Sequence, residues 1–141
     1  MAITKIFVNL PAADIKGSTA FYEALGGSVN PEFSDESSAS IVLGDAVFVQ
    51  LMTRERFATF TKRPIASDGI EVINALGVES RDDVDRIGGA ALAAGGTETG
   101  EANDMGWMYG RSFADLDGHH WEVMFMDEAA MAEAFASGGD A

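Results

Sequence analysis

The sequence predicts an α+β protein in which two βαβββ modules form an open, incomplete barrel. Three observations lead to this fold class: the order strand, helix, strands occurs twice, hairpin turns join most strands, and a polar connector separates the two runs. Too few helices alternate with the strands for a doubly wound parallel sheet. The concave side of such a barrel is a natural ligand cavity.

The first module is expected over residues 1–61. Asp14 is the predicted N-cap of its long helix, and Gly26 follows the end of that helix. Gly44-Asp45 separates two short apolar runs and predicts a type II′ hairpin turn. The predicted elements are a strand over 3–10, a helix over 15–25, strands over 38–43 and 46–52, and a short helix over 54–61.

The second module repeats this order after a connector at residues 62–69. Ser80 is the predicted helix N-cap, and Asp117-Gly118 predicts a type I′ hairpin turn. The predicted elements are a strand over 70–78, a helix over 81–94, and strands over 106–116 and 119–126. The second module thus spans 70–126, a C-terminal helix and tail occupy 127–141, and all of these parts form a single domain, 1–141.

Composition narrows the class of partners. The chain has 141 residues, of which 47% are hydrophobic, so it can bury a sizeable core. Its net charge of −14 repels phosphate backbones and anionic headgroups, which argues against nucleic-acid or membrane partners. The absence of cysteine excludes thiolate metal ligands and a cysteine nucleophile. No long apolar run or signal-peptide pattern is present, and we expect a cytoplasmic protein.

Two segments carry a resemblance to a known family. Residues 7–26, FVNLPAADIKGSTAFYEALG, and residues 113–123, FADLDGHHWEV, resemble the opening module and the final hairpin of the vicinal-oxygen-chelate superfamily. That superfamily includes glyoxalase I, bleomycin-resistance proteins and extradiol dioxygenases, and MYGRSF at 108–113 resembles its group of predicted lactoylglutathione lyases. The resemblance implies the glyoxalase/bleomycin-resistance fold over nearly the whole chain, and a homodimer.

The resemblance also implies a divalent metal held by one side chain from each of four strands. The matching positions here are Phe7, Gln50, Ile73 (Asn74 if the register shifts) and Glu122. Phenylalanine and isoleucine donate no electron pair, and a neutral amide is a poor substitute for imidazole or carboxylate. We therefore expect no metal at this site and no cofactor, and Glu122 is left as the one strong ligand.

Strand alternation and neighbouring motifs nominate the ligand-binding residues. Trp107 and Tyr109 follow a loop at 100–106 and either stack on a planar ligand or pack in the core or at an interface. Asn9 either binds a ligand or satisfies backbone at the rim. Glu122 either forms a structural ion pair with Arg111, anchors a ligand, or serves as a catalytic acid or base. The full predicted set is Phe7, Asn9, Phe48, Gln50, Ile73, Trp107, Tyr109, Arg111 and Glu122.

Three functions remain open at this stage. The protein binds a small, mostly apolar molecule in its barrel cavity without a metal. Alternatively, it is a metal-dependent lyase, isomerase or dioxygenase that uses a displaced metal at Glu122, His120 and Gln50. In the third hypothesis it is a structural or regulatory dimer whose cavity is vestigial. Whether it is an enzyme is left undecided by the sequence.

Overall fold

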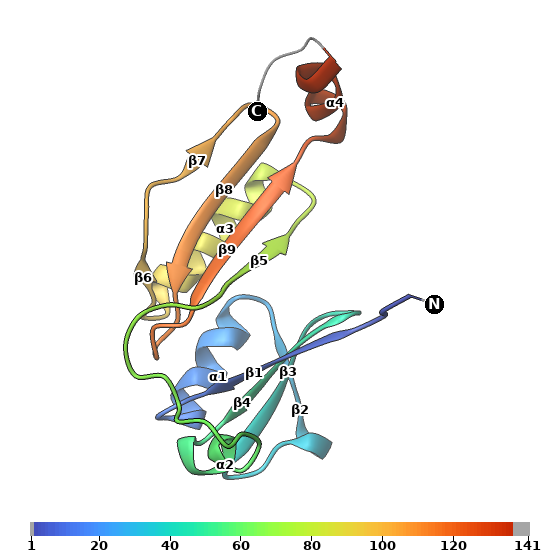
Figure 1. Ribbon diagram of the computed structural model, residues 1–141. Coiled ribbons are helices and arrows are strands. Elements are labelled where there is room, and N and C mark those ends of the chain that lie inside the picture. The colour runs from blue at the N-terminus through green and yellow to red at the C-terminus, as the bar shows by residue number, and fades with distance from the viewer. Residues whose placement is uncertain (1, 137–141) are drawn as a thin grey trace.

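A computed structural model describes residues 2–136 of the chain, so the tail expected after the last helix lies outside the described residues. Figure 1 shows two sheets, each covered by a long helix, one built from each half of the chain. The α+β class and the open barrel predicted from the sequence are confirmed: the described strands form two separate sheets, with no closed barrel.

The first sheet has the strand order β1-β4-β3-β2, and β1 runs parallel to β4. Helix α1 packs against β3 and β4. Its N-cap is Asp14, as predicted, whose side chain accepts a hydrogen bond from the Gly17 amide. The elements are β1 (Ile6–Pro11), α1 (Ile15–Ala24), β2 (Ser28–Asn30), the 3-10 turn η1 (Pro31–Phe33), β3 (Ser38–Gly44), β4 (Val47–Met52) and α2 (Arg54–Ala58).

The second sheet repeats this plan with the order β5-β9-β8-β6, and β7 also pairs with β8. Helix α3 packs against β8 and β9, and its N-cap is Ser80, again as predicted. The elements are β5 (Ile73–Gly77), α3 (Arg81–Ala93), β6 (Thr97–Glu98), β7 (Asn103–Asp104), β8 (Met108–Ala114), β9 (His120–Met126) and α4 (Glu128–Ala136).

Both hairpin turns differ from the predicted types. In the first hairpin the turn residues are Asp45 and Ala46, Gly44 still belongs to β3, and its φ is not positive. A type II′ turn needs a positive φ at its first central residue, so that prediction is wrong. In the second hairpin the Gly118 amide donates to the Asp115 carbonyl, and only Gly118 has a positive φ, 88°. A type I′ turn needs two positive φ values, so that prediction is wrong as well.

One core joins the two modules. Tyr22 and Phe21 of α1 lie buried with Trp121 of β9 and Phe113 of β8. The rings of Tyr22 and Trp121 meet edge to face, with their centroids 5.9 Å apart. This packing fixes which face of the second sheet points inward, because Trp121 and Val123 alternate with His120, Glu122 and Met124 along β9.

No helix among residues 2–136 is long and apolar enough to cross a bilayer.

Candidate functional site: a pocket on the second sheet

The strand register gathers small and polar side chains on the face of the second sheet that points away from α3. Glu122 lies on the central strand β9, directly opposite Ser112 on β8 and Ala75 on β5. The next row along contains Met124 between Gly110 and Gly77. Small neighbours on both sides of Glu122 and Met124 leave the sheet surface hollow at this point.

This hollow is a pocket of about 230 Å³. Its floor comes from β8 and β9, while Glu101 and Asn103 of the segment between β6 and the end of β7 form its side. A Cβ added at Gly110 would lie 3.6 Å from the sulfur of Met108 and 3.3 Å from the Val123 carbonyl oxygen. The glycine therefore contributes directly to the depth of the floor. The lining residues are Glu101, Asn103, Met108, Gly110, Arg111, Ser112, Glu122 and Met124.

An ion pair on the rim fastens the segment that bears Glu101 and Asn103. Both terminal nitrogens of Arg81 donate to the Asp104 carboxylate, at 2.9 and 2.7 Å. These hydrogen bonds lower the pKa of Asp104 to about 2. The Arg81 guanidinium also lies over the Tyr109 ring, 4.9 Å from its centroid. Asp104, at the end of this segment, is thus bound to Arg81 at the start of α3.

The Glu122 side chain has no hydrogen-bond or ionic partner among residues 2–136, although it is partly buried. The predicted alternative of an ion pair with Arg111 is wrong, because Arg111 pairs with Val123 and leaves the sheet on the opposite face. The Arg111 Nη1 there lies 3.3 Å from the carbonyl oxygen of Asp85 and 3.7 Å from its carboxylate. Only the main chain of Arg111 is on the pocket side of its strand.

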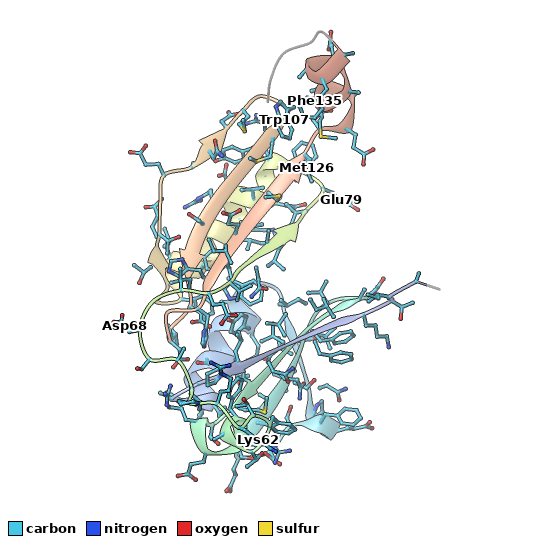
Figure 2. The ribbon with its side chains drawn as sticks, viewed as in Figure 1. Lys62, Asp68, Glu79, Trp107, Met126 and Phe135 are labelled. Atoms are coloured by element: carbon cyan, nitrogen blue, oxygen red, sulfur yellow. The ribbon has the colours of Figure 1, made fainter. Side chains whose placement is uncertain are left out.

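The two predicted aromatic residues are also engaged elsewhere. The Tyr109 hydroxyl donates to the Asp85 carboxylate at 2.6 Å, on the helix side of the sheet. This hydrogen bond to Asp85 raises the pKa of Tyr109. Figure 2 shows Trp107 beside Phe135 of α4, with ring centroids 5.4 Å apart. Trp107 and Tyr109 thus both contact residues of their own chain, which favours packing over the predicted alternative of stacking on a ligand.

The predicted residues of the first module form a separate surface on their own sheet. Phe7 and Phe48 are paired across β1 and β4, and their rings stack with centroids 4.8 Å apart. The Lys5 amine lies 5.7 Å from the centre of the Phe48 ring. In the next row along the strands Asn9 pairs with Gln50. The side-chain amide of Asn9 donates to the Phe7 backbone carbonyl, which is one of the two roles that the sequence left open for Asn9.

The structure therefore does not bring all of the predicted ligand-binding residues into one pocket. Phe7, Asn9, Phe48, Gln50 and Ile73 do not line the pocket that contains Glu122. A second cavity, of about 290 Å³, lies between β1 and β5 on the helix side and is lined by none of the nine predicted ligand-binding residues. It is lined by Ile6, Val8, Leu25, Leu43, Gly44, Val47, Asn74, Ala75, Leu76, Gly77, Val78, Ile87 and Trp121.

The four positions of the implied metal site do not fit a metal. The register fixes Ile73 rather than Asn74 as the third position, because Ile73 pairs with His120 and so shares the face of Glu122. Phe7 and Ile73 are apolar, and half of each side chain remains exposed, 54% and 51%. One carboxylate and one amide are left as donors, too few to retain a divalent ion in competition with water.

A second group of possible donors lies in the β8–β9 turn, outside the pocket. Oxygens of Asp115 and Asp117 and a nitrogen of His119 lie within 4.8 Å of one another. Asp115 accepts from the Tyr22 hydroxyl at 2.5 Å and from the amides of Asp117 and His119. The His119 Nε2 lies 2.8 Å from the Pro11 carbonyl oxygen and must donate its proton there, because a carbonyl only accepts.

These donors hold the fold together rather than a metal. Asp117 accepts from the Ala13 amide and the Ser18 hydroxyl at the start of α1. Its negative charge also stabilises that helix N-terminus. The turn thereby links the second module to the first through side chains of all three residues.

Sequence reasoning missed most of the pocket lining. Met108, Gly110 and Ser112 belong to the MYGRSF segment, where alternation along a strand places them on one face, but Glu101 and Asn103 carry no such signal. Their position depends on the two-residue strands β6 and β7, whose pairing with β8 cannot be read from so short a stretch.

Comparison with known proteins identifies the class. The chain matches the Glyoxalase/Bleomycin resistance protein/Dioxygenase superfamily over residues 6–123, and it belongs to that family. This confirms the resemblance noted in the two sequence segments. A search of the curated proteins found no match.

Solved structures agree with this assignment. A hypothetical protein from S. aureus is 30% identical, with a TM-score of 0.74, over 89% of this chain and 95% of that chain. A glyoxalase-related enzyme from Fulvimarina pelagi is 21% identical, with a TM-score of 0.72, over 84% and 85% of the two chains. A lactoylglutathione lyase from Agrobacterium tumefaciens is 14% identical, with a TM-score of 0.66, over 89% and 95%. At these identities the last two show a shared fold alone.

Proposed function

We propose that this protein binds a small, mostly apolar molecule in a cavity of its open barrel without the metal site implied by its superfamily. The observation that carries the proposal is the pocket at Glu122, which is hollow, partly apolar and centred on a carboxylate that no described residue engages. Ligand pockets combine apolar lining with a few polar groups that orient the ligand, and this pocket has both.

The alternative, a metal enzyme with a displaced metal, lacks donors in this sheet. His120 shares the face of Glu122, but the residues paired with these two are Ile73, Ala75, Ser112 and Ala114. None of the four is a carboxylate or an imidazole. Glu101 also lines the pocket, but the donor atoms of Glu101, His120 and Glu122 do not all lie within 4.8 Å of one another, so a metal here would have fewer than the three protein ligands found in open catalytic zinc sites.

A fragment screen against metal-free protein tests the proposal. The protein is treated with chelator, and small neutral and charged compounds are screened by amide chemical shifts. We expect hits that shift Gly110, Ser112 and Met124. A saturating ligand at 100 times its Kd adds about 2.7 kcal/mol to the free energy of unfolding.

Two variants locate the binding. Ser112→Leu places a bulky side chain next to Glu122 and should abolish the hits, whereas Ser28→Leu makes the same change at an exposed position of β2 and should preserve them. Hits that persist in Ser112→Leu, or that appear only after a divalent metal is added, would refute the proposal.

We also propose a homodimer. Within the described part of the chain, strands β1 and β5 each pair with one neighbour, and the half-exposed Phe7 and Ile73 lie on them. Such edges and apolar side chains favour association. Sedimentation at micromolar concentration should give a species near twice 14.9 kDa that weakens at low salt, because each chain carries −14. A single species near 14.9 kDa at 150 mM salt would reject the dimer.

A further inference from the structure

The pocket at Glu122 has a chemical character that narrows the class of its ligand. Two of its lining side chains, Glu101 and Glu122, are carboxylates, and two more, Asn103 and Ser112, are neutral polar groups. Met108 and Met124 supply its apolar surface. Thioether side chains adapt their shape to a ligand and make favourable contacts with aromatic rings.

Among residues 2–136 no basic side chain forms an ion pair with either carboxylate. Arg111 is the one basic residue of the lining, and its guanidinium lies on the far face of the sheet beside Asp85. Arg81, at the nearby rim, is held by Asp104 through both of its terminal nitrogens. The Lys5 side chain lies beside the first sheet, over the ring of Phe48. These three basic groups are thus engaged elsewhere.

Glu122 presents a carboxylate that no described residue engages. Its side chain is partly buried on the central strand of the sheet, with no donor within hydrogen-bond distance in the described part of the chain. The Glu122 oxygens remain in contact with solvent, because no buried side-chain oxygen among residues 2–136 lacks a partner, and a ligand cation can form a charge-assisted hydrogen bond with them. The net charge of −14 also raises the local concentration of cations around the molecule.

We propose that the pocket recognises an organic cation: an ammonium group that Glu122 binds, with Glu101 contributing to the field, on a compact apolar or aromatic body that packs between Met108 and Met124. This inference rests on the proposed function, because it names the ligand class of the same pocket. An anionic ligand of equal size is excluded by the two uncompensated carboxylates.

Three probes of nearly equal shape test the charge requirement. Benzylamine is a cation at pH 7, benzyl alcohol is neutral and benzoate is an anion. Each is titrated into metal-free, ¹⁵N-labelled protein, and the Kd is taken from the amide shifts of Gly110, Ser112 and Met124. We expect benzylammonium to bind about tenfold more tightly than benzyl alcohol, the effect of one charge-assisted hydrogen bond, and benzoate to bind most weakly.

A matched pair of variants tests whether the preference for benzylammonium comes from the pocket or from the net negative charge of the protein. Glu122→Gln keeps the shape and removes the charge, so it should reduce the preference for benzylammonium over benzyl alcohol to less than threefold. Glu79→Gln removes the same charge from an exposed residue that does not line the pocket (Figure 2) and should leave the preference unchanged. Raising the salt concentration should weaken benzylammonium binding but not benzyl alcohol binding.

The outcomes distinguish this inference from the proposed function. If benzyl alcohol or benzoate binds as well as benzylammonium, the pocket binds ligands but the charge requirement is wrong. A preference that survives Glu122→Gln, or that Glu79→Gln reduces equally, overturns the role of Glu122. If none of the three probes shifts the pocket amides, both the inference and the proposed function are contradicted.

Discussion

Asp115 and Glu122 lie on the same β8–β9 hairpin and have opposite surroundings. Asp115 is 5% exposed, and its two oxygens accept hydrogen bonds from the Tyr22 hydroxyl and from two amides of the turn. Glu122 is partly buried and accepts none from the described residues. Because the fold already engages every oxygen of the first carboxylate, only the second is available to a ligand.

The difference also separates two kinds of surface. The turn at 115–119 joins the modules through Asp117 and His119, so its polar groups are used in folding. The pocket floor around Glu122 is built from main chain, Gly110 and small or flexible side chains, and no described residue hydrogen-bonds to the Glu122 carboxylate there. Substitutions in the two regions should therefore affect different measurements.

The largest expected effect is on stability at the turn. Asp115→Ala leaves the Tyr22 hydroxyl and two amides without an acceptor in the core, and we expect a loss of about 3 kcal/mol in the free energy of unfolding. Glu122→Gln should change it by less than about 0.5 kcal/mol. Urea denaturation of both variants measures the contrast, and similar losses in both would contradict it.

The buried Tyr22 beside Asp115 should also make the stability of the protein depend on pH in the alkaline range. Burial and the neighbouring Asp115 raise the pKa of Tyr22 far above its ordinary value. The folded protein therefore keeps the Tyr22 proton when the unfolded chain loses it, above about pH 10, so stability is retained below this pH and falls as pH rises.

Urea denaturation at several pH values between 8 and 11 measures how steeply the free energy of unfolding falls as the pH rises. In Tyr22→Phe the decline due to this residue should disappear, although the variant also loses its two hydrogen bonds and starts from a lower stability. Tyr109→Phe, at a less buried tyrosine, should retain most of the decline. An unchanged slope in Tyr22→Phe would show that another group causes it.

The smallest expected effect concerns the segment beside the pocket. Arg81→Gln removes the ion pair with Asp104 and should accelerate amide exchange at Asn103 and Asp104, while the free energy of unfolding changes by less than about 0.5 kcal/mol, as for most exposed pairs. Arg86→Gln breaks an exposed pair with Asp83 within α3 and serves as the control. Equal exchange in both variants would argue against a fastening role for Arg81.

Local signals explain how much the sequence could predict. Asp14 and Ser80 each precede a helix with a capping side chain, and the structure uses both. Such signals act over three residues and need no tertiary information. The β2 strand and the 3-10 turn η1 were missed because three-residue elements have too few positions to show a period.

The site was harder to predict because its residues depend on register. Glu122 was found through its motif, whereas the side taken by Arg111 follows from its pairing with Val123, which sequence alone does not supply. A shift of one residue would have turned Arg111 toward the pocket. The left-handed glycine at Gly118 was correctly placed in a turn, but the turn type prediction did not take into account Asp115, whose carboxylate accepts from the amides of Asp117 and His119 and whose carbonyl accepts from the Gly118 amide.

The most direct test of this account is a titration of benzylammonium into metal-free wild type and Glu122→Gln, with the free energy of unfolding measured on the same two samples. We predict that the Kd rises about tenfold in Glu122→Gln while the free energy of unfolding stays within about 0.5 kcal/mol of the wild-type value. An unchanged Kd, or a change in Kd matched by a large loss of stability, would contradict the claim that Glu122 is available for a ligand rather than used by the fold.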